Sequence, residues 1–289
     1  MLKHTRSRVL LLGKDGMLGS AIFRRLKLET GIDLFATSRG NSAEYYFDAQ
    51  HSSLKLIIEE LKPHYIINCI GYIHPKLNLA SIVEALKVNT FFSKRLSRIS
   101  IERDIFSIQI GTNAVFFGYS GNYSEMSTRL PKTFYGLTKM LGENPNQKSL
   151  LIRCSIIGEE KNSTSPKSLF NWFCNLPKQS KIDGYSNQIW NGITTNTFAD
   201  LCAGIIKNSY TIGGIHHFIP SNCISKNTLL NYFQELLGRD DLKIYSSFGK
   251  KKTNLTLTTV DQNRNKYFWS LAGFDYVPDI RELVLTTLI

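Results

Sequence analysis

Cysteine is scarce in this sequence and lies in no pattern typical of a disulfide framework or a zinc site. The five cysteines are odd in number, widely spaced and never arranged as CxxC. No apolar run approaches the about 20 residues of a membrane-spanning helix, and the run at 9–13 is too short for the core of a secretory signal. We therefore expect a soluble, unprocessed cytoplasmic protein that does not bind membranes.

Acidic residues are outnumbered by basic ones, 23 against 35, so the 289-residue chain carries a net charge of +12. This charge favours anionic partners. The cations are scattered, and the densest run, 249–252, is most simply a solvated loop, so no groove for a nucleic-acid backbone is predicted. With 42% hydrophobic residues and 8 prolines, the composition is that of a globular protein with room for one α/β domain and a smaller lobe.

A glycine-rich turn follows the first predicted strand. Residues 8–12 form a short apolar run, typical of a parallel strand buried on both faces, and Gly13, Gly16 and Gly19 follow it as GxxGxxG. Residues 20–26 then repeat apolar side chains at helical spacing. A dinucleotide pyrophosphate binds in this setting, because glycines let it approach the backbone N–H groups of a helix N-terminus. The order of strand, turn and helix predicts such a site, although three glycines alone also fit an ordinary turn.

Helical and strand-like segments alternate along the rest of the chain. The predicted strands are 33–38, 65–71, 105–110 and 151–157, and the predicted helices are 53–62, 79–98, 168–176, 195–207, 226–237 and 281–288. This alternation predicts an α/β fold, a Rossmann-type doubly wound parallel sheet with a smaller C-terminal substrate-binding lobe. We assign 1–155 to the NAD(P)-binding domain, with elements around 190–220 returning to it, and 156–289 mainly to the lobe.

Arg39 stands where an NAD-preferring protein places a carboxylate after the second strand. A guanidinium binds a 2′-phosphate bidentately, so we expect NADPH as the cofactor, with NADH as the alternative. A solvated surface arginine is the other interpretation of this position. Asp48 follows a further short run, and its spacing suggests a hydrogen bond with the adenine amino group.

Thr112, Tyr135 and Lys139 form the sharpest candidate for catalysis. Thr112 follows the strand at 105–110, and Tyr135 and Lys139 share one helix face because they are four residues apart. A lysine ammonium beside a phenol lowers the phenol's pKa, so we expect Tyr135 to be a usable proton donor. Thr112 would bind the same carbonyl oxygen of a substrate. By itself, YxxxK also fits a solvated helix face.

Together these motifs resemble those of the extended short-chain dehydrogenases/reductases, most closely the dTDP-4-dehydrorhamnose reductase group of nucleotide-sugar reductases. The resemblance extends over nearly the whole chain. It is carried by LGKDGMLG at 12–19, INCIG at 67–71, GTNAVF at 111–116, GNYSE at 121–125, YGLTKMLGE at 135–143, IRCS at 152–155 and IWNGITT at 189–195.

The resemblance implies the reduction of a nucleotide-linked 4-keto-6-deoxy sugar in polysaccharide biosynthesis. It implies that Tyr135 protonates the C4 keto oxygen, that Lys139 lowers the pKa of Tyr135 and binds the nicotinamide ribose, and that Thr112 polarises the carbonyl. The implied cofactor-binding residues are Gly13, Lys14, Gly16, Met17, Leu18, Gly19, Ser38, Arg39, Asp48, Ala49, Cys69, Ile70, Gly71, Asn89, Tyr135 and Lys139. The implied substrate-binding residues are Tyr72, Thr112, Asn113, Tyr135 and Trp190.

Three positions depart from the family pattern. Gly111 and Asn113 replace a Ser and an Asp. Ile156 stands where rhamnose-type reductases carry a Trp that would pack against the sugar ring. These departures keep two alternatives open, a non-catalytic NADP-binding regulatory subunit of a partner enzyme and a nucleotide-sugar epimerase. A nucleotide sugar is the expected ligand, and a homodimer is the assembly that the family suggests.

No metal site is predicted from the sequence. His74, His216 and His217 have no third ligand at a supportive spacing. We therefore interpret them as structural histidines.

Overall fold

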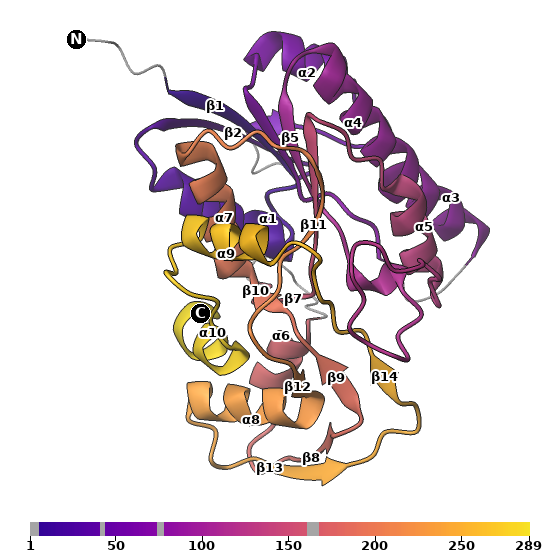
Figure 1. Cartoon of the computed structure of the whole chain (residues 1–289), viewed down its shortest axis with the longest axis vertical. Coiled ribbons are helices and arrows are strands. Elements are labelled where there is room, and N and C mark those ends of the chain that lie inside the picture. The colour runs from indigo at the N-terminus through magenta and orange to yellow at the C-terminus, as the bar shows by residue number, and fades with distance from the viewer. Residues whose placement is uncertain (1–5, 41–43, 74–77, 161–167) are drawn as a thin grey trace.

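A sheet of seven parallel strands forms the centre of the fold, in the order β11-β6-β5-β4-β1-β2-β3 (Figure 1). The computed structural model describes residues 6–40, 44–73, 78–160 and 168–289. The strands of the sheet are β1 (Ser7–Leu12), β2 (Ile32–Ser38), β3 (Tyr45–Tyr46), β4 (Tyr65–Asn68), β5 (Phe106–Ile110), β6 (Ser149–Arg153) and β11 (Gly214–His217). The strand order reverses between β1 and β4, which confirms the predicted doubly wound Rossmann-type sheet.

Helices cover both faces of this sheet. They are α1 (Met17–Lys27), α2 (Leu54–Leu61), α3 (Leu79–Ala85), α4 (Ser93–Glu102), α5 (Phe134–Gly142), α7 (Thr195–Lys207) and α9 (Gln262–Leu271). Val9 and Leu11 of β1 pack in a core with α1, α7 and α9, whereas Leu10 and Leu12 pack in a second core with α2 and α4. Because successive side chains of a strand point to opposite faces, the apolar run of β1 supplies both cores.

The predicted helix at 79–98 is longer and less regular than expected. The Asn78 side chain accepts a hydrogen bond from the Ser81 backbone at 2.8 Å and thereby caps the start of α3. A π-helical segment, Leu86–Phe92, then joins α3 to α4, which continues to Glu102. This segment contains the buried Asn89, and such π segments often lie at functional sites.

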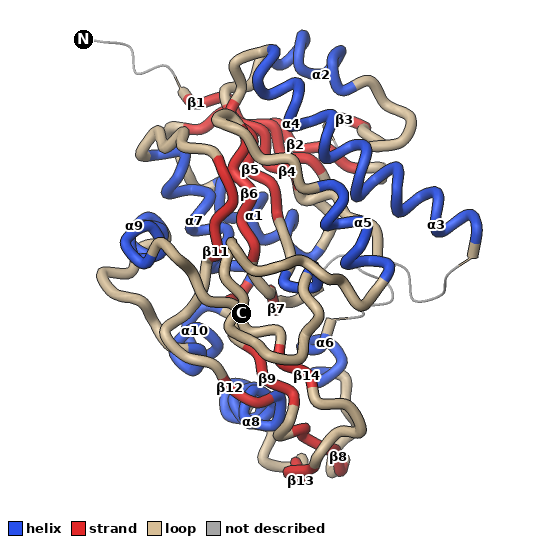
Figure 2. Tube along the Cα trace, turned by 45° about the vertical axis from the view of Figure 1, so that its right-hand side comes forward, coloured by secondary structure: helices blue, strands red, loops and turns tan. Residues whose placement is uncertain are grey.

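A second group of elements lies at one end of the molecule, below the sheet in Figure 2. It contains α6 (Leu169–Cys174), α8 (Lys226–Leu237), α10 (Ile280–Thr287), β7 (Ile156–Ile157), β8 (Lys181–Tyr185), β9 (Gln188–Trp190), β10 (Ile193–Thr194), β12 (Ile224–Ser225), β13 (Lys243–Ser247) and β14 (Thr253–Asn254). Phe170, Phe173 and Phe233 form part of its separate core. The strand predicted at 151–157 is divided between β6 and β7, and the assignment of 156–289 to a lobe stays a prediction.

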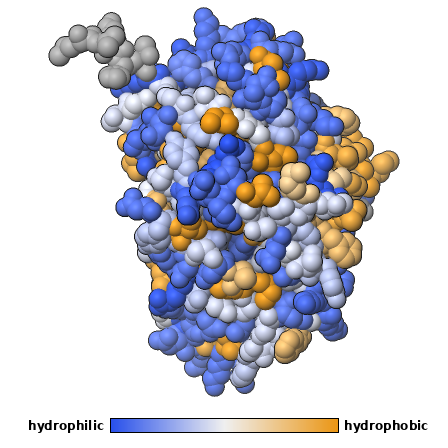
Figure 3. Space-filling view, viewed as in Figure 1, coloured by the Kyte–Doolittle hydropathy of each residue, from blue (hydrophilic) through white to orange (hydrophobic). Residues whose placement is uncertain are grey.

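Several apolar side chains are exposed on the helices at one edge of the sheet. They are Leu79 and Val83 on α3, Phe91 in the π-helical segment, and Leu137 and Leu141 on α5. Figure 3 shows apolar surface along the right-hand edge, where α3 and α5 lie in the matching view of Figure 1. Among the described residues, no helix combines the length and apolar character that crossing a membrane requires.

Candidate functional site

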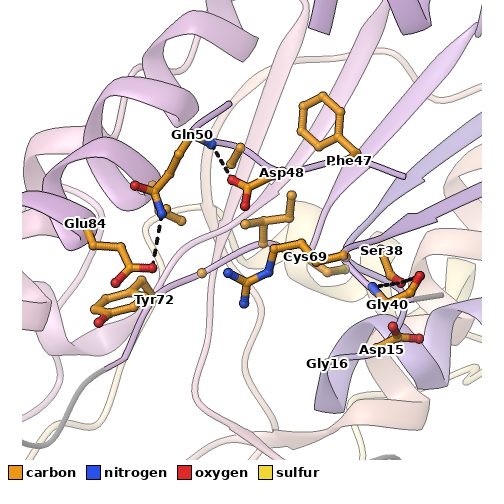
Figure 4. Close-up of a pocket in the computed structure, with 16 residues that line it drawn as sticks. Asp15, Gly16, Ser38, Gly40, Phe47, Asp48, Gln50, Cys69, Tyr72 and Glu84 are labelled. Carbon is orange, nitrogen blue, oxygen red and sulfur yellow. Dashed lines mark hydrogen bonds between the residues drawn. The ribbon is translucent and has the colours of Figure 1, made fainter. Parts of the chain in front are cut away.

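A cavity of about 630 Å³ lies at the carboxyl ends of β1, β2 and β4 (Figure 4). In a doubly wound sheet, ligands bind at this edge, next to the point where the strand order reverses. The predicted residues that line the cavity are Gly13, Gly16, Ser38, Arg39, Asp48, Ala49, Cys69, Ile70, Gly71 and Tyr72. The predicted residues Lys14, Met17, Leu18, Gly19, Asn89, Tyr135 and Lys139 are not among those that line it.

The glycine turn forms one wall of the cavity. Gly13 has a φ of 84°, a value that favours glycine, and its backbone N–H donates to the Thr37 carbonyl at 3.2 Å. A Cβ at Gly16 would have no neighbour closer than 3.7 Å, so this residue leaves open space at the N-terminus of α1. Space beside the first backbone N–H groups of a helix suits a phosphate. The turn therefore fits the dinucleotide that the sequence predicts.

The cavity is also lined by residues that sequence reasoning missed. They are Asp15, Gly40, Phe47, Gln50, Glu84 and Val88. Asp48 accepts a hydrogen bond from the Gln50 backbone at 2.7 Å, and the Gln50 side chain donates to Glu84 at 3.1 Å. Gln50 and Glu84 are 34 positions apart, so no local sequence signal could have joined them.

Tyr72, predicted to contact substrate, lines this cavity. Its backbone is fixed by the buried Asn89, which accepts from the Tyr72 N–H at 2.9 Å and donates to the Tyr72 carbonyl at 2.9 Å. The Asn89 amide also donates to the Thr138 hydroxyl at 3.0 Å. Asn89 therefore joins the cavity wall to α5, and the cofactor contact that the resemblance implies for it stays a prediction.

The structure brings Thr112, Tyr135 and Lys139 together. A side-chain hydrogen bond joins Tyr135 to Thr112, and the Lys139 ammonium donates to the Ile110 carbonyl at 2.8 Å. The Thr112 hydroxyl also accepts from the Ala114 N–H at 3.2 Å. Thr112 follows β5, and Tyr135 and Lys139 lie on α5, whose start is capped by the Thr133 hydroxyl.

One electrostatic expectation for this group is wrong. Burial raises the pKa of Tyr135, and the hydrogen bond to Thr112 opposes that rise only in part. Burial also lowers the pKa of Lys139, against the attraction of Glu143. Since the Lys139 ammonium is bound to the Ile110 carbonyl, it does not dominate the environment of the phenol, and Tyr135 keeps its proton at neutral pH.

A buried ionic network lies behind these three side chains. Arg153 donates through Nε and Nη2 to the two oxygens of Glu143, both at 2.7 Å, and both side chains are at most 3% exposed. Arg153 Nη1 lies 3.3 Å from His217 Nε2, and His217 Nδ1 lies 2.7 Å from the Thr258 carbonyl. A Cβ at Gly111 would lie 2.7 Å from the Arg153 side chain, which explains why this chain has no serine there.

Asn113 and Trp190, the other predicted substrate residues, use their polar groups within the protein. The Asn113 amide donates to the Leu255 carbonyl at 3.1 Å. The Trp190 ring nitrogen donates to the Ser155 hydroxyl at 2.7 Å, and the ring packs so closely on Gly192 that a Cβ there would lie 2.2 Å away. These are structural contacts, and the substrate contacts that the resemblance implies for Asn113 and Trp190 stay predictions.

The described histidines hold no metal site. In the described part of the chain, no three His, Cys, Asp or Glu side chains are placed to hold a metal ion. His216 hydrogen-bonds to Arg264, and His217 belongs to the network of Arg153. His74 lies outside the described residues.

The sequence matches the family described as the RmlD substrate binding domain over residues 7–245. Curated proteins similar to part of the chain include the methionine adenosyltransferase 2 subunit beta of Xenopus tropicalis, 27% identical over 157 residues, which are 52% of this chain and 47% of that protein. The same subunit of Xenopus laevis is 29% identical over 140 residues, 47% of this chain and 41% of that protein. The chain thus spans about half the length of the curated relatives that it matches.

Solved structures share the fold over almost the whole chain. A dTDP-4-dehydrorhamnose reductase from Clostridium acetobutylicum has a TM-score of 0.75 at 21% identity, covering 96% of this chain and 97% of that one. The dTDP-4-dehydrorhamnose reductase from Bacillus anthracis, in complex with NADP, has a TM-score of 0.76 at 18% identity with the same coverage. A UDP-glucose 4-epimerase from Thermotoga maritima, with UDP-glucose, has a TM-score of 0.72 at 14% identity and covers 97% of each chain.

Proposed function

The chain belongs to the RmlD substrate binding domain family, and we propose that it is an NADPH-dependent reductase of a nucleotide-linked 4-keto-6-deoxy sugar. The observation that carries this proposal is the hydrogen-bonded pair of Thr112 and Tyr135, with Lys139 one helical turn away. The reductases named above, one of them in complex with NADP, support it through their shared fold.

The cavity and the three side chains supply complementary parts of this reaction. NADPH, when bound, supplies the hydride that reduces the carbonyl carbon. The residues that would hold it are those of the glycine turn, with Arg39 toward the 2′-phosphate. Open space at Gly16 and the positive φ of Gly13 fit such a group.

The protein's own residues handle the proton. Tyr135 donates its hydroxyl proton to the carbonyl oxygen as that oxygen gains negative charge, and Thr112 donates a hydrogen bond to the same oxygen. The raised pKa of Tyr135 keeps the proton in place until transfer. The hydrogen bond from Thr112 stabilises the resulting phenolate, with the Lys139 ammonium one helical turn away, and a proton from solvent restores the hydroxyl.

The partner of this reaction is a nucleotide sugar, and a second copy of the chain is the assembly that we propose. The apolar side chains of α3 and α5 support a homodimer, because large exposed apolar patches on soluble proteins commonly mark interfaces. All five cysteines are unpaired, in keeping with the cytoplasmic location that we expect for this chemistry.

A direct test measures the absorbance of reduced nicotinamide while purified protein meets NADPH or NADH and a panel of dTDP, UDP and GDP 4-keto sugars generated in place by a dehydratase. A decay confined to one sugar and faster with NADPH is the expected result. A flat trace from folded protein that binds NADPH would contradict the catalytic proposal.

The second candidate is a regulatory subunit, which the curated relatives favour because they are named as subunits beta of another enzyme. It predicts a stable complex with an unrelated enzyme and no turnover. An epimerase would instead form product without net consumption of NADPH. Retention of Thr112, Tyr135 and Lys139 favours the reductase, since a scaffold has no use for a proton donor at this place.

A further inference from the structure

Residues 253–260, which we call the strap, form an extended segment bound to the loop that follows β5. The Tyr123 N–H donates to the Thr256 carbonyl at 3.0 Å, and the Thr258 N–H donates to the Tyr123 carbonyl at 2.9 Å. At the end of the strap, Glu125 accepts from the Thr259 hydroxyl at 2.7 Å and from the Val260 N–H at 3.0 Å. One edge of the strap is therefore paired as in a parallel sheet.

Two asparagine side chains bind the strap at further backbone positions. Asn113 donates to the Leu255 carbonyl at 3.1 Å. Asn191 donates to the Leu257 carbonyl at 2.7 Å and accepts from the Leu257 N–H at 2.9 Å. Both asparagines are buried. Their amides therefore satisfy backbone hydrogen-bonding groups of the strap that would otherwise be buried without a partner.

Asn113 also belongs to the turn that holds Thr112. The Thr112 hydroxyl caps this turn, Asn113–Val115, by accepting from the Ala114 N–H. The turn closes when the Phe116 N–H donates to the Asn113 carbonyl at 3.1 Å. Since Thr112 also hydrogen-bonds Tyr135, a displacement of Asn113 would move a hydroxyl that contacts the proton donor.

We propose that Asn113 is a positioning residue, whose amide ties Thr112 to the strap and so fixes the Thr112 hydroxyl beside Tyr135. The contact needs a hydrogen-bond donor, because its partner is a carbonyl oxygen. An ionised carboxylate has none and would repel that oxygen, so this chain requires an amide here. The inference rests on the proposed reductase function and assigns no contact between Asn113 and substrate.

The test compares Asn113→Asp with Asn122→Asp, a matched control in the same loop. Asn122 acts as an acceptor toward the Thr256 hydroxyl at 3.4 Å, a role that aspartate keeps, and its φ of 50° suits aspartate as well as asparagine. Both variants add the same charge. We expect kcat to fall roughly 10- to 100-fold in Asn113→Asp and to change little in Asn122→Asp, with the Kd for NADPH maintained in both.

A double-mutant cycle with Thr112→Val separates positioning from general structural damage. If Asn113 acts through the Thr112 hydroxyl, Asn113→Asp causes little further loss of kcat once that hydroxyl is absent. If Asn113→Asp lowered kcat by the same factor in the wild type and in Thr112→Val, the proposal would be overturned. If Asn113→Asp does not fold, Asn113→Ser, which shortens the side chain without adding charge, enters the same cycle.

Amide hydrogen exchange tests the tie without turnover. We expect faster exchange of the Thr256 and Thr258 N–H groups in Asn113→Asp than in Asn122→Asp. Unchanged exchange in Asn113→Asp would overturn the inference whether or not the protein is a reductase. Absence of turnover by the wild-type protein across the sugar panel, with exchange altered as expected, would count against the proposed function and leave the tie between Asn113 and the strap established.

Discussion

Gly19 lies directly against the carbonyl of Gly13, so closely that a Cβ on Gly19 would stand 2.0 Å from that oxygen. The glycine turn that lines the cavity is therefore held compact by a direct contact between its first and last glycines. We expect Gly19→Ala to lower the free energy of unfolding by about 1–3 kcal/mol or more and to weaken NADPH binding, because the turn must open. Chemical denaturation and fluorescence titration measure the two effects.

Gly31→Ala is the matched control for this change. A Cβ at Gly31 would meet nothing within 4 Å, and Gly31 is exposed before β2. We expect the free energy of unfolding and the Kd for NADPH of this variant to be close to those of the wild type. Equal effects of the two substitutions would show that the contact between Gly19 and Gly13 is unimportant.

The part of the candidate site that the sequence could predict is built from residues close together in the chain. Gly13 and Gly16 line the cavity, because a strand, a turn and a helix that follow one another fix their own geometry. The contact between Thr112 and Tyr135 was expected from the resemblance to a family and not from any local pattern.

Contacts between residues far apart in the chain could not be predicted from the sequence. Asn113 donates to the carbonyl of Leu255, 142 positions along the chain, and no local pattern encodes that contact. Helix α9 was not predicted, although it buries Phe268 and Trp269, because its other side chains are mostly polar and give weak helical periodicity. Burial also decides the pKa of Tyr135, and burial depends on the whole fold.

Tyr135→Phe removes the proposed proton donor and little else. We expect turnover to fall by at least about 100-fold, because general acid catalysis commonly contributes that much. NADPH binding should remain close to wild type, since Tyr135 is not among the residues that line the cavity. Steady-state kinetics and cofactor titration are compared with Tyr245→Phe, an exposed residue of β13. Undiminished turnover in Tyr135→Phe would remove it from the mechanism.

Arg39→Ala tests the preference for NADPH. Arg39 is exposed and lines the cavity after β2, where a guanidinium can bind the 2′-phosphate. We expect the Kd for NADPH to rise roughly 10-fold or more, as expected for loss of a charged hydrogen bond, and the Kd for NADH to change little. Arg24→Ala, on the exposed side of α1, controls for the loss of one positive charge. Equal losses for both cofactors would contradict this role.

Arg153→Met breaks the buried pair with Glu143. The remaining carboxylate keeps its contact with Arg129 at 2.7 Å but loses two hydrogen bonds in a site at most 3% exposed. We expect a loss of about 3–5 kcal/mol in the free energy of unfolding, measured with urea. Arg98→Met, which removes an exposed pair with Glu102 at 3.3 Å, should cost less than about 1 kcal/mol. Similar losses in the two variants would show that burial of the ionic network contributes little.

His216 makes stability depend on pH below neutrality. Burial, helped by the positive charge of Arg264, lowers the pKa of this histidine from 6.5 to about 4 in the folded protein. Between these values the unfolded chain binds a proton that the folded protein does not, so the free energy of unfolding falls as the pH falls from 6.5 toward 4.

Replacement of His216 by glutamine removes this proton uptake. We expect the loss of stability between pH 7 and pH 5 to be smaller in His216→Gln than in the wild type, by about 1 kcal/mol after allowance for partial solvent exposure of the ring. Urea unfolding at the two pH values measures the difference. Some dependence remains in the variant, because burial also lowers the pKa of His217. The same pH dependence in both proteins would mean that His216 is protonated in the fold, and that its contact with Arg264 does not hold it neutral.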